Sequence, residues 1–381
     1  MTGFDYYIPT KILFGPGKLA QLATEPLPGK KALIVISNGT SMHKYGYLER
    51  VQNLLKTQGV ESVVFDKIMP NPIKEHVTEG AEMAKEHGCD FVIGLGGGSS
   101  IDAAKSIAIM AVNPGDYWDY IHGGSGKGQP VKNGALPIVA ITTTAGTGTE
   151  ADPWTVITNG DEKIGFGDPS CTFPVLSVVD PELMVSIPPH LTAYQGFDAF
   201  FHAAEGVIAN IATPVSDLYA LESIRLITKY LPRAVKDGND IEARGYVALA
   251  NTLSGMVEST SCCTSEHSLE HALSAFHHEL PHGAGLIMLS EAYFKFFEDK
   301  IPECFSKMAS AMGSENFIEG LVELQKACNV RGLKMSDYGI TEDELGAVAK
   351  NARETMGFLY EMDRVPLTDE DAESILRASY F

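Results

Sequence analysis

Histidines are concentrated in one short stretch of this sequence, HSLEHALSAFHHELPHG at residues 267–283, which holds five of the eleven in the chain. His267 and His271 are four residues apart, so on a helix they lie on the same face. His282 stands between a proline and a glycine, from where it can return toward that face. Imidazoles that converge in this way are suited to binding a metal or carrying a proton.

A second pair of potential ligands lies upstream, in GFDAFFHAAEG at residues 196–206. Asp198 and His202 are again four residues apart on an expected helix, so both can face one point. One carboxylate and three imidazoles suit a borderline divalent ion such as Fe²⁺, Zn²⁺, Co²⁺ or Mn²⁺. A single pair would fit structural histidines, but two pairs and a PHG turn favour a metal site. The spacing does not choose between His267 and His271 as a ligand.

Two glycine-rich turns, GLGGGSSIDAAK at 94–105 and TTAGTG at 143–148, have the composition of phosphate-binding loops. In the first, glycines separate an expected strand from an expected helix, whose N-terminus offers free N–H groups to a pyrophosphate. The turn matches neither GxGxxG nor GxxxxGK[ST], so alone it fits an unliganded tight turn equally well. The hydroxyls of the second turn can reach the same crevice, which favours nucleotide binding.

The first half of the sequence alternates β-branched strand patterns with amphipathic helix patterns. This order predicts a parallel sheet with helices on both faces, and ligands of such sheets bind beyond the carboxyl ends of the strands. Both glycine-rich turns follow an expected strand and so lie at such an end. We expect strands within 31–37, 62–66, 89–100 and 136–150, and helices over 47–59, 75–88 and 101–111.

The second half has almost no strand patterns and reads as helical. Pro188 and Pro189 break the segment that precedes it. The sequence therefore predicts an α/β dinucleotide-binding domain over 1–188 and an all-helical metal-binding domain over 189–381. The clearest helix patterns in the second domain cover 216–235, 243–260 and 314–330.

The composition is that of an ordinary globular protein, with 381 residues, 44% apolar and 20% charged. A formal charge of −20 argues against nucleic acid and anionic membranes as partners. We expect no signal peptide and no spanning helix, because the first residues lack a basic start and no apolar run approaches ~18 residues. Six cysteines, scattered apart from one adjacent pair and without a CxxC motif, indicate reduced thiols and a cytoplasmic location.

Taken together, these motifs resemble the iron-containing (group III) alcohol dehydrogenases, in an order that runs through essentially the whole chain. The resemblance rests on GGGSSIDAAK (96–105), TTTAGTGTE (142–150), GFDAFFHAAE (196–205), and HSLEH followed by PHG (267–283). It implies the dehydroquinate synthase-like fold of that family: an α/β dinucleotide-binding domain, an all-helical domain, and a metal in the cleft between them.

The resemblance also implies roles for individual residues. His271 matches a histidine that is not a ligand but lies near the substrate, a candidate catalytic proton carrier. The residues that match the metal ligands are Asp198, His202, His267 and His282. The residues that match cofactor contacts are Asn71, Gly97, Gly98, Ser99, Asp102, Thr143, Thr144, Thr147 and Lys163.

The implied activity is hydride transfer between NAD(P)(H) and a small primary alcohol, diol or aldehyde, with Fe²⁺, Zn²⁺ or another divalent ion polarising the substrate oxygen. Two departures leave the cleft shape and the substrate open: Ala272-Leu273 replaces a common proline, and the stretch before His282 is one residue longer. The alternatives are a zinc-containing polyol enzyme like glycerol dehydrogenase, the lyase dehydroquinate synthase, and a non-catalytic nucleotide- or metal-binding protein. Aromatic residues that can either shape the pocket or pack in the core are Trp154, Phe166 and Phe276.

The turn after the first strong strand pattern, residues 37–41, carries no carboxylate to bind the ribose hydroxyls of NAD. His43 and Lys44 follow closely, and this pattern favours NADPH. Members of the family are often dimers joined through their N-terminal strands. The resemblance therefore implies a homodimer, for which YYIPTKILFG at residues 6–15 can serve.

Overall fold

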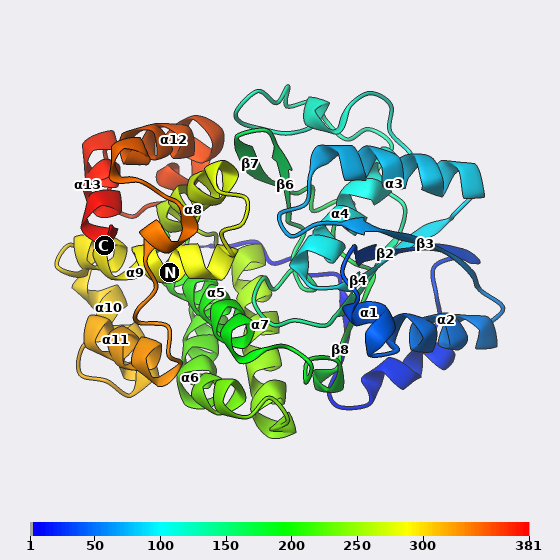
Figure 1. The fold of residues 1–381 in the computed structure, drawn as a ribbon, viewed down its shortest axis with the longest axis horizontal. Helices are drawn as coiled ribbons and strands as arrows, with labels where there is room; N and C mark the ends of the chain where they lie inside the picture. The colour runs from blue at the N-terminus through cyan, green and yellow to red at the C-terminus, as the bar shows by residue number, and fades with distance from the viewer. Residues whose placement is uncertain (1–2, 381) are drawn as a thin grey trace.

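The computed structural model describes residues 3–380, which form an α/β half and a helical half (Figure 1). The α/β half contains a six-stranded sheet in which every pair of neighbours runs parallel, in the order β1-β8-β5-β4-β2-β3. The predicted fold class is confirmed by this architecture. The strands are β1 (Lys11–Phe14), β2 (Lys31–Ser37), β3 (Glu61–Ile68), β4 (Phe91–Gly96), β5 (Ile138–Thr142) and β8 (Leu176–Val179).

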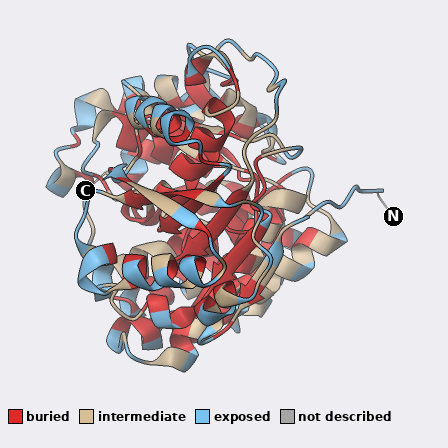
Figure 2. Ribbon diagram, turned by 90° about the vertical axis from the view of Figure 1, so that its right-hand side faces the viewer, coloured by how far each residue is buried: buried red, intermediate tan, exposed pale blue. Residues whose placement is uncertain are grey.

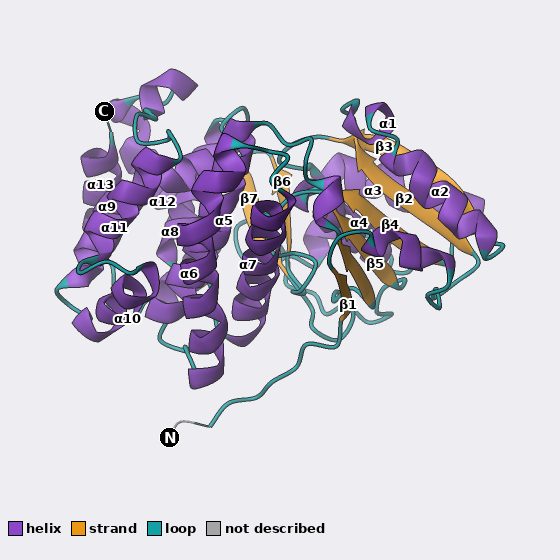
Figure 3. Cartoon of the chain, turned by 90° about the horizontal axis from the view of Figure 1, so that it is seen from below, coloured by secondary structure: helices purple, strands orange, loops and turns teal. Residues whose placement is uncertain are grey.

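Helices cover both faces of the sheet, because alternate side chains of a strand point in opposite directions. Leu33 of β2 packs with residues of α3 (Lys74–His87) and α4 (Gly98–Met110). Its neighbour Ile34 belongs to a separate core with α2 (Tyr47–Thr57). Figure 3 shows the strands between these layers. The helix α4 begins directly after β4, so its N-terminus lies at the carboxyl edge of the sheet.

A hairpin of β6 (Thr155–Asn159) and β7 (Glu162–Phe166) lies apart from the main sheet and is antiparallel. It packs between α4 of the α/β half and two helices of the other half, α8 (Ser265–Phe276) and α12 (Leu345–Glu361). The sequence patterns predict neither this hairpin nor β1 and β8. Each of these strands is only four or five residues long, and periodicity over so few positions is ambiguous.

The helical half surrounds one continuous core. Figure 2, seen from the side of the α/β half, shows buried residues through the interior of the molecule and exposed residues on its outer helices and loops. Its helix starts follow ordinary capping chemistry: α5 and α6 begin with a proline, and Thr213 forms a capping box with Ser216. None of the helices among the described residues is long and apolar enough to cross a membrane. Besides α8 and α12, the helices are α5 (Pro189–Ile208), α6 (Pro214–Lys236), α7 (Ile241–Thr260), α9 (His282–Glu298), α10 (Pro302–Met312), α11 (Phe317–Ala327) and α13 (Asp369–Ser379).

Candidate active site

The four residues that match metal ligands come from three helices and meet beside one cavity. Asp198 and His202 lie one turn apart on α5, His267 lies in the first turn of α8, and His282 is the first residue of α9. The adjacent cavity has a volume of ≈140 Å³ and opens between the two halves of the molecule. From the α/β half it is lined by Asn71, Gly98, Ser99, Asp102, Thr147 and Lys163, among others.

The donor atoms of these residues converge on one carboxylate oxygen. Asp198 Oδ1 lies 3.5 Å from His202 Nδ1, 3.7 Å from His267 Nε2 and 3.4 Å from His282 Nε2. Oδ1 of Asp198, Nδ1 of His202 and Nε2 of His267 are buried and have no hydrogen-bond partner among the described residues. Ligands that each lie about 2.0–2.2 Å from an ion stand at this kind of separation from one another, so the donor set fits a divalent cation.

Two buried glutamates orient the imidazoles from behind. Glu205 bonds to His267 Nδ1, and Glu270 bonds to His282 Nδ1. Glu205 is held in turn by the backbone N–H and the hydroxyl of Thr264, both 2.9 Å from its Oε1. A carboxylate that binds Nδ1–H leaves the lone pair on Nε2, the nitrogen that faces Asp198. Neither glutamate is predicted from the sequence patterns.

The electrostatics of the cluster favour a cation. Burial alone would raise the pKa of Asp198, but the imidazoles of His202 and His282 hold it well below its ordinary value. Burial lowers the pKa of His202 to about 3, so this imidazole is neutral. Burial opposes protonation of His282 as well, yet Glu270 and Asp198 raise its pKa. The three buried carboxylates, Asp198, Glu205 and Glu270, give the cluster a negative charge that protonated imidazoles or a bound positive ion can compensate.

His271, the candidate proton carrier, lies one turn beyond His267 on α8 and lines the same cavity. Its ring centroid is 5.3 Å from that of His282, and its Nδ1 is 2.9 Å from Met356 Sδ. Burial lowers its pKa well below the ordinary value, and Lys163 lowers it further. The imidazole is therefore neutral, and it is a weaker base than an exposed histidine.

The two glycine-rich turns touch each other at the carboxyl edge of the sheet. A Cβ built on Gly98 would lie 2.4 Å from Thr147 Cγ2, and one on Gly97 would lie 3.0 Å from Thr144 Cγ2. Only glycine therefore fits at these positions without movement. Gly97, Thr143 and Thr144 do not line the cavity itself but lie behind it, where the N–H of Thr143 donates to the Gly96 carbonyl at 2.8 Å.

Other residues that match cofactor contacts line the cavity and form hydrogen bonds to neighbouring segments. Asn71 Nδ2 donates to the His278 carbonyl at 3.1 Å and so bridges the two halves. Asp102 accepts from the Thr149 hydroxyl at 2.7 Å and from the N–H of Val156 at 3.0 Å, and burial raises its pKa to about 6. These bonds fix α4 against the hairpin.

Lys163 lies on β7 and reaches toward the metal side of the cavity. Its Nζ donates to Ser274 Oγ at 2.8 Å and lies 3.5 Å from Glu270 Oε2. Of the aromatic candidates, Trp154 lines the cavity, whereas Phe166 and Phe276 pack in the cores. Cavity-lining residues that sequence reasoning missed include Glu258, Cys262, Cys263 and Met356.

Comparison with family models covers both halves of the chain. Residues 9–181 match the iron-containing alcohol dehydrogenase model, and residues 192–380 match the C-terminal model of the Fe-containing alcohol dehydrogenase family. Together the two matches include every residue of the candidate site.

Individual proteins agree with this. The chain is 33% identical over 364 residues to the NAD-dependent methanol dehydrogenase of Bacillus methanolicus, covering 92% of this chain and 93% of that protein. It is 36% identical over 327 residues to the 1,3-propanediol dehydrogenase of Klebsiella pneumoniae, covering 85% and 82%. An archaeal alcohol dehydrogenase from a Red Sea brine pool has the same fold, with a TM-score of 0.95, 34% identity and coverage of 100% and 99%.

The fold, the sequence matches and the donor set, which is suited to a metal ion, all support the same family. The chain belongs to the iron-containing alcohol dehydrogenase family, as an NAD(P)-dependent oxidoreductase that acts on alcohols.

Proposed function

We propose that this protein is a metal-dependent alcohol dehydrogenase and aldehyde reductase for a small primary alcohol, diol or aldehyde. The observation that carries the proposal is the approach of three imidazole nitrogens to Asp198 Oδ1, at 3.4–3.7 Å, beside the N-terminus of α4. Asp198, His202, His267 and His282 would hold Fe²⁺, Zn²⁺ or another divalent ion. Such an ion, when bound, supplies Lewis acidity to the substrate oxygen.

The chain's own residues would then handle the proton and the hydride donor. His271 is proposed as the first acceptor of the alcohol proton, which leaves as the hydride passes to the nicotinamide. Its neutral state and its place on the cavity wall support this role. The surrounding apolar side chains, including Met356 and Leu359, keep water from the reacting carbon.

The nucleotide would lie across the two glycine-rich turns. Gly97, Gly98 and Ser99 offer the N-terminus of α4 to the pyrophosphate, and Thr143, Thr144 and Thr147 form the second wall. In this arrangement Asn71 lies near the adenosine half and Asp102 near the cofactor or substrate. Lys163 would lie on the nicotinamide ribose side. Because Lys163 also contacts Glu270, and Glu270 binds His282, this lysine would link nucleotide binding to the orientation of His282.

We also propose a preference for NADPH. The turn after β2 carries no carboxylate, and α1 (Ser41–Lys44) follows it. His43 Nδ1 lies 3.5 Å from Glu49, so Lys44 is the cation left to meet a 2′-phosphate. Comparison of kcat/KM for the two nucleotides tests this: a higher value with NADPH that falls in Lys44→Ala supports it, and a strong NADH preference contradicts it.

The proposed reaction is tested by removing metal with a chelator, restoring Fe²⁺ or Zn²⁺, and screening small aldehydes, alcohols and diols with both nicotinamides. We expect absorbance changes of the nicotinamide that depend on added metal. Activity that is indifferent to metal, or a metal spectrum that no alcohol changes, would contradict the proposal.

Three further predictions accompany this function: the cytoplasmic location, the homodimer and the domain boundary after residue 188. All six cysteines are free, which supports a reducing compartment. The strand β1 lies at an edge of the sheet, where a second copy can pair with it. Sedimentation analysis of the purified protein tests the dimer.

A further inference from the structure

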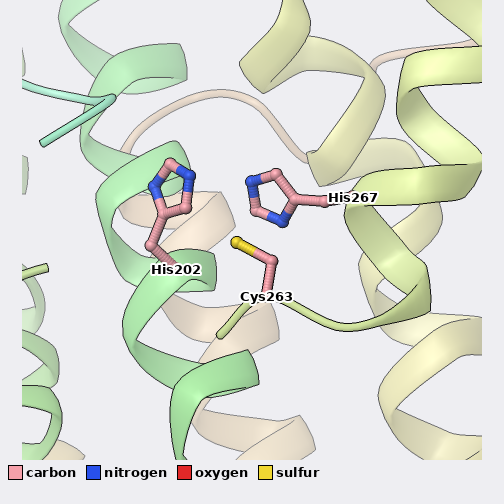
Figure 4. Close-up of side chains that lie close together, drawn as sticks. All are labelled: His202, Cys263 and His267. Atoms are coloured by element: carbon pink, nitrogen blue, oxygen red, sulfur yellow. The ribbon is translucent and has the colours of Figure 1, made fainter. Parts of the chain in front are cut away.

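A sulfur donor lies beside the proposed ion. The Sγ of Cys263 and one ring nitrogen each of His202 and His267 lie within 4.8 Å of one another. All three side chains are more than nine-tenths buried, with exposed fractions of 8%, 5% and 4%. Figure 4 shows the sulfur pointing to the gap between the two rings. The trio shares His267 with a second three-donor group, Asp198, His267 and His282.

The surroundings of Cys263 differ from those of the other buried cysteines. Cys304, for example, packs in the helical core, where its Sγ lies 3.6 Å from the backbone carbonyl of Val207. Cys263 lines the cavity, where its Sγ lies 3.7 Å from Glu258 Oε2 and also contacts the imidazole of His267. Its neighbour Cys262 also lines the cavity but does not belong to a donor group.

His202 stands between the two donor groups. Its Nδ1 lies 3.5 Å from Asp198 Oδ1, whereas its Nε2 lies 3.4 Å from Glu258 Oε1. Nδ1 of His202 and Nε2 of His267 are buried without a hydrogen-bond partner among the described residues. Both imidazoles therefore have a nitrogen near Asp198, and one ring nitrogen of each lies within 4.8 Å of the sulfur, so Cys263 is a third donor beside two of the proposed ligands.

We propose that Cys263 is an additional metal ligand of this protein, which gives the centre a thiolate together with His202 and His267. The proposal rests on the metal centre of the proposed function. Coordination breaks the S–H bond and forms a metal–sulfur bond, and the proton leaves to solvent through the cavity. A soft thiolate favours Zn²⁺ and Co²⁺ over Mn²⁺, which prefers oxygen ligands. The centre is therefore selective for a thiophilic ion.

The test is spectroscopic. The protein is stripped with a chelator and loaded with Co²⁺, whose bond to a thiolate gives a near-ultraviolet charge-transfer band absent from nitrogen and oxygen ligation. We expect this band in the wild type and in the matched control Cys262→Ser, and its loss in Cys263→Ser and Cys263→Ala. The visible cobalt bands should remain in all four proteins. Competition with a chelator should show that the dissociation constant for Zn²⁺ is higher in Cys263→Ser than in the wild type, by a factor of roughly ten or more, because the variant has lost a metal partner.

The outcomes separate this proposal from the proposed function. Visible cobalt bands without a near-ultraviolet band in the wild type would overturn the role of Cys263 while leaving the metal centre in place. Failure to bind cobalt at all would overturn both. X-ray absorption on the zinc-loaded wild type gives a result that needs no variant: a sulfur neighbour at about 2.3 Å supports the proposal, and a shell of nitrogen and oxygen alone contradicts it.

Discussion

The two walls of the cleft present different chemical groups. The wall proposed to bind the nucleotide, called the nucleotide wall below, is made of backbone: at Gly98 a single added carbon would lie 2.4 Å from Thr147. The wall proposed to bind the metal, called the metal wall, is made of side chains, whose donor atoms face Asp198 and are oriented by buried glutamates. Ligand binding at the nucleotide wall should therefore depend on the space left by the glycines, and at the metal wall on the charge and orientation of the side chains. Substitutions in the two walls should change different measured quantities, nucleotide affinity and metal affinity.

The largest effect is expected for Asp198→Asn. The amide has nearly the same shape but no charge, so the three imidazoles would face a neutral oxygen or an NH₂ group in place of a carboxylate oxygen. Loss of the ion removes several kcal/mol of stabilisation of the transition state, so kcat/KM should fall on the order of 1,000-fold. Metal analysis after dialysis should show an empty protein. Quenching of NADPH fluorescence should show nucleotide binding retained, and equal loss of both ligands would refute the separation of the two walls.

His271→Ala should separate proton transfer from metal binding on the same wall. Removing a general acid or base lowers turnover by roughly 100-fold or more, so kcat should fall by about that factor. Metal content should stay at the wild-type level, because the proposed ligands are intact. His278→Ala, an exposed neighbour in sequence, is the matched control. If metal is lost from His271→Ala in proportion to activity, the residue is a ligand instead.

Glu270→Gln tests the orientation of the imidazoles. The amide removes the charge behind His282 while keeping the shape of the side chain. Loss of such a partner weakens metal binding by about 10- to 100-fold, which a chelator competition measures. Glu279→Gln, an exposed glutamate in the preceding loop, should change nothing. Unchanged metal affinity in Glu270→Gln would mean that the metal wall does not depend on this carboxylate.

The partners of these glutamates explain why the sequence did not reveal them. Glu205 follows His202 by three residues, and Glu270 follows His267 by three, so each shares a helix face with a candidate ligand. Each nevertheless binds an imidazole from another segment: Glu205 binds His267 and Glu270 binds His282. Helix spacing could flag the two carboxylates as neighbours of the site. Only the packing of α5, α8 and α9 decides which histidine each one orients.

In the fold, too, local sequence patterns predicted some elements, whereas others depend on tertiary packing. Long periodic elements were predictable: the helix expected over 75–88 is α3 (Lys74–His87), and the strand expected at 31–37 is β2. The β6–β7 hairpin was not, because its strands are short and derive their stability from contacts with α4, α8 and α12. The role proposed for Cys263 was not predictable either, because nothing in its local sequence shows that it lies near two histidines.

Gly98→Ala should affect the nucleotide wall alone. The added methyl would overlap Thr147 Cγ2, and overpacking of this kind costs about 1–3 kcal/mol. The dissociation constant for NADPH should therefore rise about tenfold, with metal content unchanged. Thr147→Ser removes the clashing methyl group, so the double variant should bind NADPH better than Gly98→Ala. A double variant no better than the single one would show that the loss has another cause.

The smallest effect is expected where the two walls join, at Glu150. This fully buried carboxyl group ends the second glycine-rich turn and accepts from Asn251 Nδ2 at 2.9 Å and Thr252 Oγ1 at 2.7 Å, both on α7. Burial raises its pKa from an ordinary 4.5 to about 7. Because the folded pKa is the higher one, its contribution to stability is complete below pH about 4.5 and is lost as the pH rises through 7.

Glu150→Gln keeps an acceptor for Asn251 and Thr252 but cannot ionise. The variant should match the wild type at pH about 4.5 and become the more stable protein as the pH rises through 7, by an amount on the order of 3 kcal/mol at most. In a chain of this size that difference is a shift of only a few degrees in Tm. Thermal unfolding across this pH range measures it. A stability difference that stays constant with pH would show that the pKa of Glu150 is the same in the folded and the unfolded protein, and that the joint between the walls depends on its hydrogen bonds alone.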